Sequence, residues 1–183
     1  VVILPEGLKY VSGFDYTNIT GVQFPSTLEA IGGGDDTDYG SSSSGDTGAF
    51  RGCSSLMCEI ALPSSLKRIG RGAFSQSAIK GNLVLPNGLQ KTGSSAFYKC
   101  SGLTGSLTIP GGIKVIPGSA FAECGFTGNL ILPMGLTEIG ASAFHSTKFK
   151  GELNIPSTVT AIGNGAFGYT MFNGTLILPK ELN

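Results

Sequence analysis

Residues 163–168 read GNGAFG and match the pattern G-x-G-x-x-G. This pattern binds the pyrophosphate of a dinucleotide when it joins a strand to a helix inside a βαβ unit. No helical pattern follows it here, so we expect no nucleotide site in this segment and no cofactor.

His145 is the single histidine and could in principle act as a base. Catalysis of the serine-hydrolase kind would require an oriented carboxylate partner, and the sequence places none in register with it. The equivalent positions in the repeats described below hold very different residues, so we expect this column to face solvent and the protein not to be an enzyme. These residues are Arg51, Ser75, Tyr98, Ala122 and Gly168.

The segment DDTDYG at residues 35–40 carries carboxylates that could bind a cation. An EF-hand needs Gly at its sixth position and Glu at its twelfth. Counting from Asp36, those positions are Ser41 and Thr47, so the EF-hand pattern fails. A solvated acidic loop is the main interpretation, and a weak calcium site of another kind stays open. Its carboxylates would be Asp35, Asp36, Asp38 and Asp46.

Three of the four cysteines, Cys53, Cys100 and Cys124, lie three residues after a phenylalanine. They therefore belong to one structural column, which Ser77 and Thr147 occupy in other repeats. Cys100 and Cys124 would stack about 5 Å apart with parallel side chains, an arrangement that disfavours the torsion of a disulfide. Pairs with the spacing C-x-x-C are missing, so we predict no metal centre either.

The sequence contains an internal repeat, and this repeat predicts the secondary-structure elements that position these residues. Leu-Pro, Phe-Pro or Ile-Pro steps recur along the whole chain, and between residues 63 and 179 their prolines are 23 or 24 residues apart. An Ala-Phe pair recurs in the same register, from Ala73-Phe74 to Ala166-Phe167. One such unit has too few apolar residues to close a core alone, whereas stacked units bury a continuous core, so the repeat predicts a solenoid.

Each repeat predicts the same sequence of short elements. In the unit that begins near residue 129, the alternation predicts a strand with Leu130 and Leu132 inward and Ile131 outward. Pro133 ends this strand, and Gly140 is expected to turn the backbone through a corner. Phe144 then fills the wide end of the coil. No unit has room for a long helix.

Two repeats are irregular. In the first, Phe14 and Tyr16 compete for the phenylalanine position. The second contains an insertion at 32–48, which is polar and rich in glycine and which we expect to be flexible.

Composition limits the partners. Twelve basic residues balance twelve acidic ones in 183 residues, so a large basic surface for nucleic acid is not expected. No apolar run is long enough to cross a membrane. We interpret the sequence as one solenoid domain over 1–183, a fragment of a longer or processed protein, and expect a monomer.

The unit GxLxIPxxVxxIGxxAFxxC resembles the BspA-like, or Treponema pallidum-type, leucine-rich repeat. The resemblance covers residues 1–182 and is best at 59–151, with Thr92 and Pro117 replacing the usual Ile and Gly. It implies a right-handed leucine-rich-repeat stack of about seven to eight coils with short parallel strands and little helix. It also implies a secreted or cell-surface protein that binds extracellular matrix, plasma or cell-surface proteins.

The outward strand positions form the candidate ligand-binding column. Several of its members are apolar where solubility alone would favour charge, and this is the surface that a partner protein would contact. An adhesin-type binding module is the leading hypothesis; a structural spacer in a larger surface protein and a carbohydrate-binding module are the alternatives. The column consists of Ile3, Gln23, Ala61, Val84, Thr108, Ile131, Asn154 and Ile177, and a polar rim beside it of Glu59, Asn82, Ser106, Asn129, Glu152 and Thr175.

Overall fold

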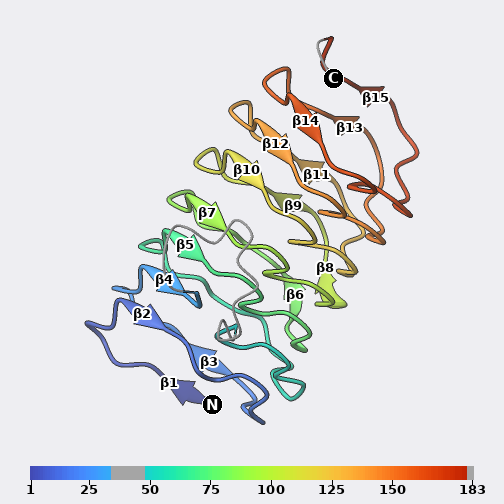
Figure 1. Cartoon of the computed structure of the whole chain (residues 1–183). Helices are drawn as coiled ribbons and strands as arrows, with labels where there is room; N and C mark the ends of the chain where they lie inside the picture. Colours follow the sequence, from blue (N-terminus) through green and yellow to red (C-terminus); the bar gives the residue numbers. More distant parts are fainter. Residues whose placement is uncertain (34–47, 181–183) are drawn as a thin grey trace.

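The computed structural model describes residues 1–33 and 48–180; residues 34–47 and 181–183 lie outside the described part. The described repeats form a parallel β-solenoid of about seven turns, in which each repeat makes one coil and the coils stack in chain order (Figure 1). No helix occurs in the described ranges. The predicted leucine-rich-repeat stack with little helix is therefore confirmed.

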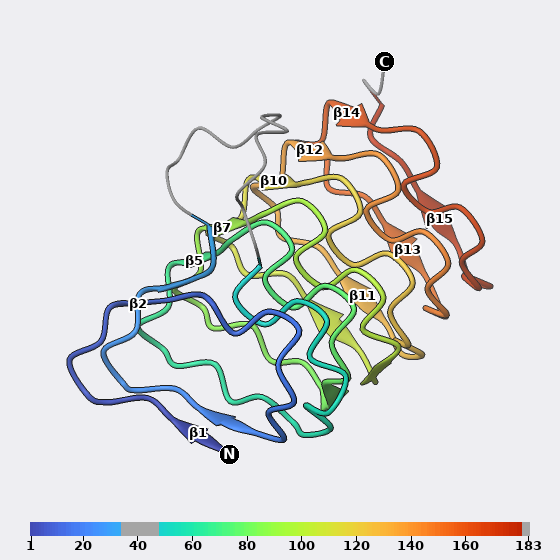
Figure 2. The same ribbon diagram turned by 60° about the horizontal axis from the view of Figure 1, so that its bottom comes forward.

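Short parallel strands form two main columns along the stack, on different sides of each coil (Figure 2). Each strand pairs with its equivalent one coil away, as when Ile116 pairs with Ile139. The first column contains β1 (Val2–Ile3), β3 (Val22–Gln23), β9 (Leu107–Thr108), β11 (Leu130–Ile131), β13 (Leu153–Asn154) and β15 (Leu176–Ile177). The second contains β2 (Tyr10–Val11), β4 (Ala30–Ile31), β5 (Arg68–Ile69), β7 (Lys91–Thr92), β10 (Val115–Ile116), β12 (Glu138–Ile139) and β14 (Ala161–Ile162). A further pair, β6 (Lys80–Asn82) and β8 (Gly102–Thr104), lies outside both columns.

The period-two alternation of the first column is confirmed. Leu130 is 6% exposed and Ile131 is 53% exposed, while Leu132 packs against the core. Leu136 and Ile139 of the same coil are fully buried. The apolar positions of the repeat thus build one continuous core through the stack.

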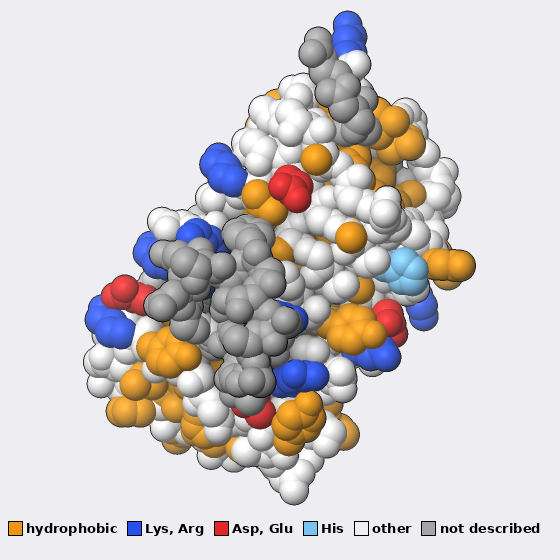
Figure 3. Space-filling view, viewed as in Figure 1, with side chains coloured by type: hydrophobic (Ala, Val, Ile, Leu, Met, Phe, Trp, Pro, Cys, Tyr) orange, Lys and Arg blue, Asp and Glu red, His pale blue; other side chains and the backbone are white. Residues whose placement is uncertain are grey.

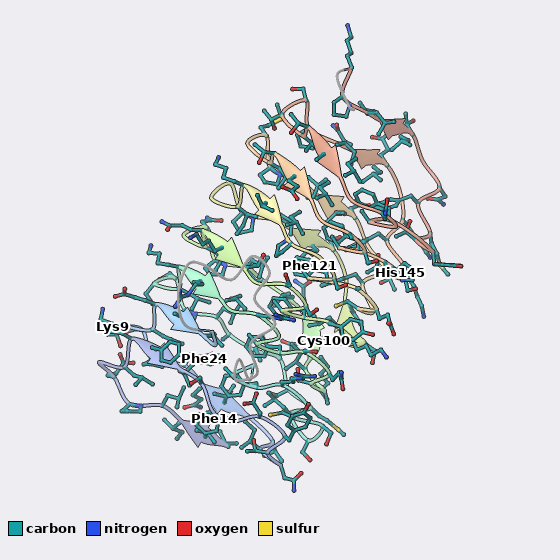
Figure 4. The ribbon with its side chains drawn as sticks, in the orientation of Figure 1. Lys9, Phe14, Phe24, Cys100, Phe121 and His145 are labelled. Carbon is teal, nitrogen blue, oxygen red and sulfur yellow. The ribbon has the colours of Figure 1, made fainter. Side chains whose placement is uncertain are left out.

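The phenylalanines of the Ala-Phe pairs form a single stacked column through the molecule. Successive rings lie 5.3–5.6 Å apart between centroids and are within 12° of parallel. Phe14 takes this position in the first coil, whereas Tyr16 is 63% exposed. Phe14 and Phe121 are labelled at two levels of the stack in Figure 4. The column comprises Phe14, Phe50, Phe74, Phe97, Phe121, Phe144 and Phe167.

The turn of each coil around its column phenylalanine, here called the Phe corner, contains left-handed backbone, which lies on both sides of the ring-bearing residue in the five coils from Phe74 to Phe167. Around Phe144, Ser142 has φ 56° and Ser146 has φ 55°. Such conformations cost an L-residue about 1–2 kcal/mol. They turn the N–H groups along the stack, so that Ser142, Phe144 and Ser146 all donate to carbonyls of the next coil at 2.8–3.0 Å. The next coil therefore compensates for the local strain. The remaining left-handed residues at these positions are Tyr16, Gly52, Gly72, Gln76, Ser95, Lys99, Ser119, Glu123, Gly165 and Tyr169.

Gly140 begins the predicted corner, because Ala143 N–H donates to its carbonyl, but the conformational reason for a glycine is wrong. Its φ is not positive, and a Cβ at this position would lie 2.6 Å from the N atom of Gly118 in the preceding coil. Glycine is needed because neighbouring coils approach closely, not because the turn requires a positive φ. Pro117 fills the same position in its coil without altering the path, since Ala120 N–H donates to Pro117 O just as Ala143 N–H donates to Gly140 O, both at 3.2 Å.

The insertion predicted at 32–48 is described only at its ends. Gly32, Gly33 and Gly48 are buried. A Cβ at Gly48 would lie 1.9 Å from the carbonyl oxygen of Gly72, so the chain returns to the stack through a close backbone contact. The acidic carboxylates proposed as a calcium site, with the predicted flexibility, lie outside the described residues.

The cysteine column is confirmed as a column of free thiols. The Sγ atoms of Cys100 and Cys124 each donate at 3.0 Å to the phenylalanine carbonyl of the preceding coil, Phe74 and Phe97 respectively. Burial raises the pKa of the Cys100 thiol to about 12 and raises that of Cys124 well above its ordinary value. Thr147 fills the same column and donates to the carbonyl of Phe144 in its own coil. The position thus requires a small side chain that can donate one hydrogen bond.

Candidate binding face and its hollows

All eight residues of the predicted outward column are exposed, and together with the polar rim they are here called the strand face. Four of them are β-branched apolar residues with large exposed fractions: Ile3 at 71%, Val84 at 66%, Ile131 at 53% and Ile177 at 46%. At Val84 and Ile131 the backbone alternation causes this exposure, because the neighbouring Leu residues occupy the inward positions, whereas Ile177 lies in the last described coil, where Leu176 and Leu178 are exposed as well. The structure thus confirms where these residues lie, while their role in binding a ligand stays a prediction.

The polar rim is also exposed, and glycines help to place it. A Cβ at Gly105 would lie 2.9 Å from Oδ1 of Asn82, and one at Gly151 would lie 2.9 Å from Oδ1 of Asn129. Both glycines have a positive φ, near 75°. Each rim amide therefore rests on a left-handed glycine of the following coil, which leaves little freedom to the side chain.

The first strand column is interrupted on this face. The strand β11 pairs with β9, and β13 pairs with β15, but no backbone hydrogen bond joins β11 to β13 within the described residues. By contrast, the second column runs unbroken through β2, β4, β5 and β7, and again through β10, β12 and β14. Between β11 and β13 the two coils are thus joined by the second column, the Phe corners and the segment before the strand, where Lys150 N–H donates to Gly128 O at 3.0 Å.

Open hollows lie along the first column, and two of the three described below lie where its strand pairing is interrupted. One of about 490 Å³ lies between the strands β11 and β13, with Ile131, Met134 and Asn154 in its wall. A second of about 340 Å³ lies between the segments 83–85 and 106–108, with Val84 and Thr108 in its wall. The third, of about 490 Å³, is lined by Asn154 and Ile177 among others. Each of the five predicted site residues of the C-terminal coils, Val84, Thr108, Ile131, Asn154 and Ile177, therefore lines a hollow.

The repeat register and the coil geometry agree with a known family. The model of the BspA type leucine rich repeat region matches residues 45–173 in six copies. The chain belongs to this family.

Two solved structures of bacterial leucine-rich repeat proteins are similar to this BspA-type chain. A leucine rich cell surface protein from Faecalibacterium prausnitzii A2-165 is 26% identical, with a TM-score of 0.71 over 92% of this chain. A leucine-rich repeat protein from Bacteroides ovatus ATCC 8483 is 23% identical, with a TM-score of 0.54 over 88% of this chain, and supports the fold. The chain spans 44% of the length of each. No curated protein matches the sequence.

His145 lies in the Phe corner of this BspA-type solenoid (Figure 4). The prediction that its column faces solvent is wrong: His145 is half-buried, and Ser75 and Ala122 in the same column are buried. The column packs between adjacent coils, as when the His145 ring meets the edge of the Tyr169 ring at 5.1 Å. Its Nδ1 lies 2.9 Å from Oγ of Ser146.

The other chemical candidates are also elements of the BspA-type repeat. Gly163 of the GNGAFG segment occupies the glycine position of close coil contact, where a Cβ would lie 2.3 Å from the N atom of Ala141. Phe167 of the same segment belongs to the phenylalanine column. Over residues 1–33 and 48–180, no group of three or more His, Cys, Asp or Glu side chains could hold a metal ion, and no helix could span a membrane.

One polar hollow was not predicted from the sequence. It lies in the Phe corners around Phe50, Phe74 and Phe97, and its wall includes Arg51 and Arg71. These arginines fall in columns whose residue type varies between repeats, so periodicity could not single them out.

Proposed function

We propose that this chain is a non-catalytic binding module of a secreted or surface-displayed bacterial protein, which contacts a partner protein through the strand face. The expected partners are extracellular matrix, plasma or cell-surface proteins. Membership of the BspA-type family and similarity to a leucine rich cell surface protein support the location.

The exposed apolar column carries this proposal. Val84 and Ile131 are 66% and 53% exposed although their inward neighbours are buried, so each could be replaced by a polar residue without loss of core packing. Apolar side chains within a polar rim are typical of the centre of a protein interface. The three hollows between the coils add concave surface to what would otherwise be a flat strand array.

The test is a charge substitution on the strand face. In the triple variant Val84→Lys, Thr108→Lys and Ile131→Lys, binding to an array of purified matrix and plasma proteins should fall at least tenfold for any protein that the wild type binds. Buried lysines without partners in the interface would cause this loss.

A matched variant controls for the added charge. Gln90, Ala161 and Asn164 are exposed residues outside the strand face. Replacing these three with Lys should leave binding unchanged, provided that circular dichroism shows both variants folded. Equal binding by the strand-face variant and the wild type would exclude the strand face as the contact surface. Absence of any wild-type binding would favour the spacer function instead.

A further inference from the structure

The hollow between β11 and β13 has a different chemistry from the hollow at Val84. Its volume of about 490 Å³ lies within the range of about 300–1,000 Å³ that is typical of ligand sites. Ile131 and Met134 supply an apolar wall, and Glu152 supplies a carboxylate. In the hollow at Val84, Ser106 takes the position that Glu152 has here, and the described residues of its wall include no charged side chain.

Met134 differs in type from the residues at the same position of the other repeats. It is 74% exposed and lines both hollows of about 490 Å³. Methionine side chains are flexible and adapt to the shape of a partner, so this position favours contact with an aliphatic group. The other repeats have a polar residue or glycine directly after the proline, namely Glu6, Ser26, Ser64, Asn87, Gly111, Ser157 and Lys180.

The carboxylate of Glu152 is exposed and unpaired. No ion pair or hydrogen bond engages it within residues 1–33 and 48–180, and the nearby Lys150 is no exception. Lys180 lies in the wall of the neighbouring hollow and not of this one. On the side shown in Figure 3, charged side chains are fewer over the upper, C-terminal coils than over the lower coils. The carboxylate is therefore available to a cation from a partner.

The interrupted strand pairing adds backbone acceptors to the same wall. Where β9 pairs with β11, Ile109 N–H donates to Ile131 O at 2.9 Å. The equivalent bond from Leu132 N–H to Asn154 O does not occur in the described part of the chain, and no N–H of β11 donates to Glu152 O. Two carbonyl groups thus lack the donor that their equivalents have, and one N–H group opposite them lacks an acceptor.

An arginine side chain matches this set of groups. Its planar guanidinium can donate two parallel hydrogen bonds to a carboxylate and has further N–H groups for neighbouring carbonyls. It is more weakly hydrated than the ammonium group of lysine, which suits a wall that is partly apolar. Its aliphatic stem can cover Ile131 and Met134 while the charged end stays at Glu152.

We propose that the hollow between β11 and β13 binds an arginine side chain from an extended segment of a partner protein, with the guanidinium on Glu152 and the stem on Met134. A backbone carbonyl of the same segment accepts a hydrogen bond from Leu132 N–H. This inference rests on the proposed function, because it names the chemistry that the strand face recognises.

The experiment is an NMR titration of the full chain, labelled with ¹⁵N and with ¹³C in the methionine methyl groups. The chain has three methionines, so Met134 reports on the hollow, and the exposed Met57 and Met171 outside its wall are internal references. The probe is the N-acetylated, C-amidated pentapeptide GVRVG. It should shift the signals of the Met134 methyl group and the Gly151 amide. No shift at Met134, or equal shifts at all three methionines, would overturn the proposal.

Two altered peptides test what is recognised. Citrulline in place of the arginine keeps the shape and removes the charge, and should raise the Kd at least tenfold. Lysine keeps the charge and removes the planar fork, and should raise the Kd several-fold. If the citrulline peptide binds as well as GVRVG, the charge is not recognised. If the lysine peptide does, the hollow is a general cation site. Either result would make the arginine assignment wrong.

Variants locate the effect. Glu152→Gln keeps the size of the side chain and should weaken the binding of GVRVG at least tenfold. Glu59→Gln is the matched control and should not change it, since Glu59 is an exposed glutamate of the same rim outside the walls of the described hollows. Met134→Ser introduces the residue of three other repeats and should weaken binding several-fold, measured at the Gly151 amide. Unaltered binding by Glu152→Gln would contradict the proposed site.

The same variants separate this inference from the proposed function. A matrix or plasma protein that the wild type binds, that the triple lysine variant of the strand face loses and that Glu152→Gln keeps would support the strand face and exclude the arginine site. Binding of GVRVG at Met134 by a chain that binds no protein of the array would support the arginine site and count against the proposed function.

Discussion

The strand face and the Phe corner are two sides of the same coils. Equivalent positions hold different residue types on the strand face and the same residue type at the Phe corner. On the strand face the outward position holds Ile, Gln, Ala, Val, Thr or Asn in different repeats, and every one of these side chains is exposed. At the Phe corner the same ring recurs in seven coils, and in the five coils from Phe74 to Phe167 the backbone on both sides of it is left-handed. Within one repeat, therefore, the residues that stabilise the stack and the residues that vary lie on different sides. The exposed surface can change while the stacked core stays the same.

The sharpest test of this comparison truncates one side chain on each side. Phe121→Ala or Phe144→Ala removes a fully buried ring that stacks on two others, and should lower the free energy of unfolding by about 3–5 kcal/mol. Ile131→Ala removes an exposed side chain and should change it by less than about 0.5 kcal/mol. Urea unfolding of the three variants measures both values, and similar losses on the two sides would refute the comparison.

A second test probes the close contact of coils next to the Phe corner. Gly140→Ala places a Cβ 2.6 Å from the N atom of Gly118 and should cost about 1–3 kcal/mol, because backbone must move. Gly111→Ala meets no atom within 4 Å and has no positive φ, so it should be neutral or stabilise by up to about 1 kcal/mol. Thermal unfolding distinguishes the two, and a neutral Gly140→Ala would show that the coils can separate there at little cost.

The buried thiols beneath the Phe corner predict a pH dependence. Thiols ionise near pH 8.5 in an unfolded chain, whereas burial raises the pKa of Cys100 to about 12 and raises that of Cys124 as well. Below about pH 8.5 both states keep these protons, and the thiols add no pH dependence. As the pH rises from about 8.5 toward 12, only the unfolded state loses them, so stability should fall by about 1.4 kcal/mol per pH unit for each thiol.

The double variant Cys100→Ser and Cys124→Ser provides the control, since Ser77 already occupies this column. Its free energy of unfolding should decline less steeply between pH 9 and pH 11 than that of the wild type. Identical slopes would mean that the thiols do not remain protonated in the folded chain.

The smallest expected effect concerns the left-handed residues themselves. Ser142 has φ 56°, so Ser142→Gly should relieve backbone strain and stabilise the chain by about 0.5–1 kcal/mol. Ser157 lies in the turn after β13 with no positive φ, and there Ser157→Gly should destabilise by a similar amount. If both variants change stability in the same direction, the left-handed backbone is not the cause.

Much of the architecture was predictable because it depends on periodicity. The inward and outward positions around Ile131 and the column of phenylalanines follow from spacing alone. The left-handed positions were not, because residues such as Lys99 and Glu123 carry no turn signal, and their conformation comes from hydrogen bonds to the next coil.

Close approach between coils explains the other differences. The sequence suggested that Gly140 is a glycine because of its turn. The reason is instead the backbone of the neighbouring coil, which leaves no room for a Cβ, and the sequence of a single repeat does not reveal this contact. The burial of Ala122 has the same origin, since its column lies between adjacent coils. The interruption between β11 and β13 likewise has no counterpart in the sequence, where the two repeats look alike.

The directions of the backbone hydrogen bonds have an electrostatic consequence for the whole stack. At the Phe corner, N–H groups donate to the following coil, as from Phe97 to Ala120, whereas around the second column several donate to the preceding coil, as from Gly140 to Ile116. Peptide dipoles aligned in one direction would add along the axis, as they do in an α-helix. Here donors on the two sides point in opposite directions, so their dipoles partly cancel and adding repeats accumulates less partial charge at the ends of the solenoid than lengthening a helix would.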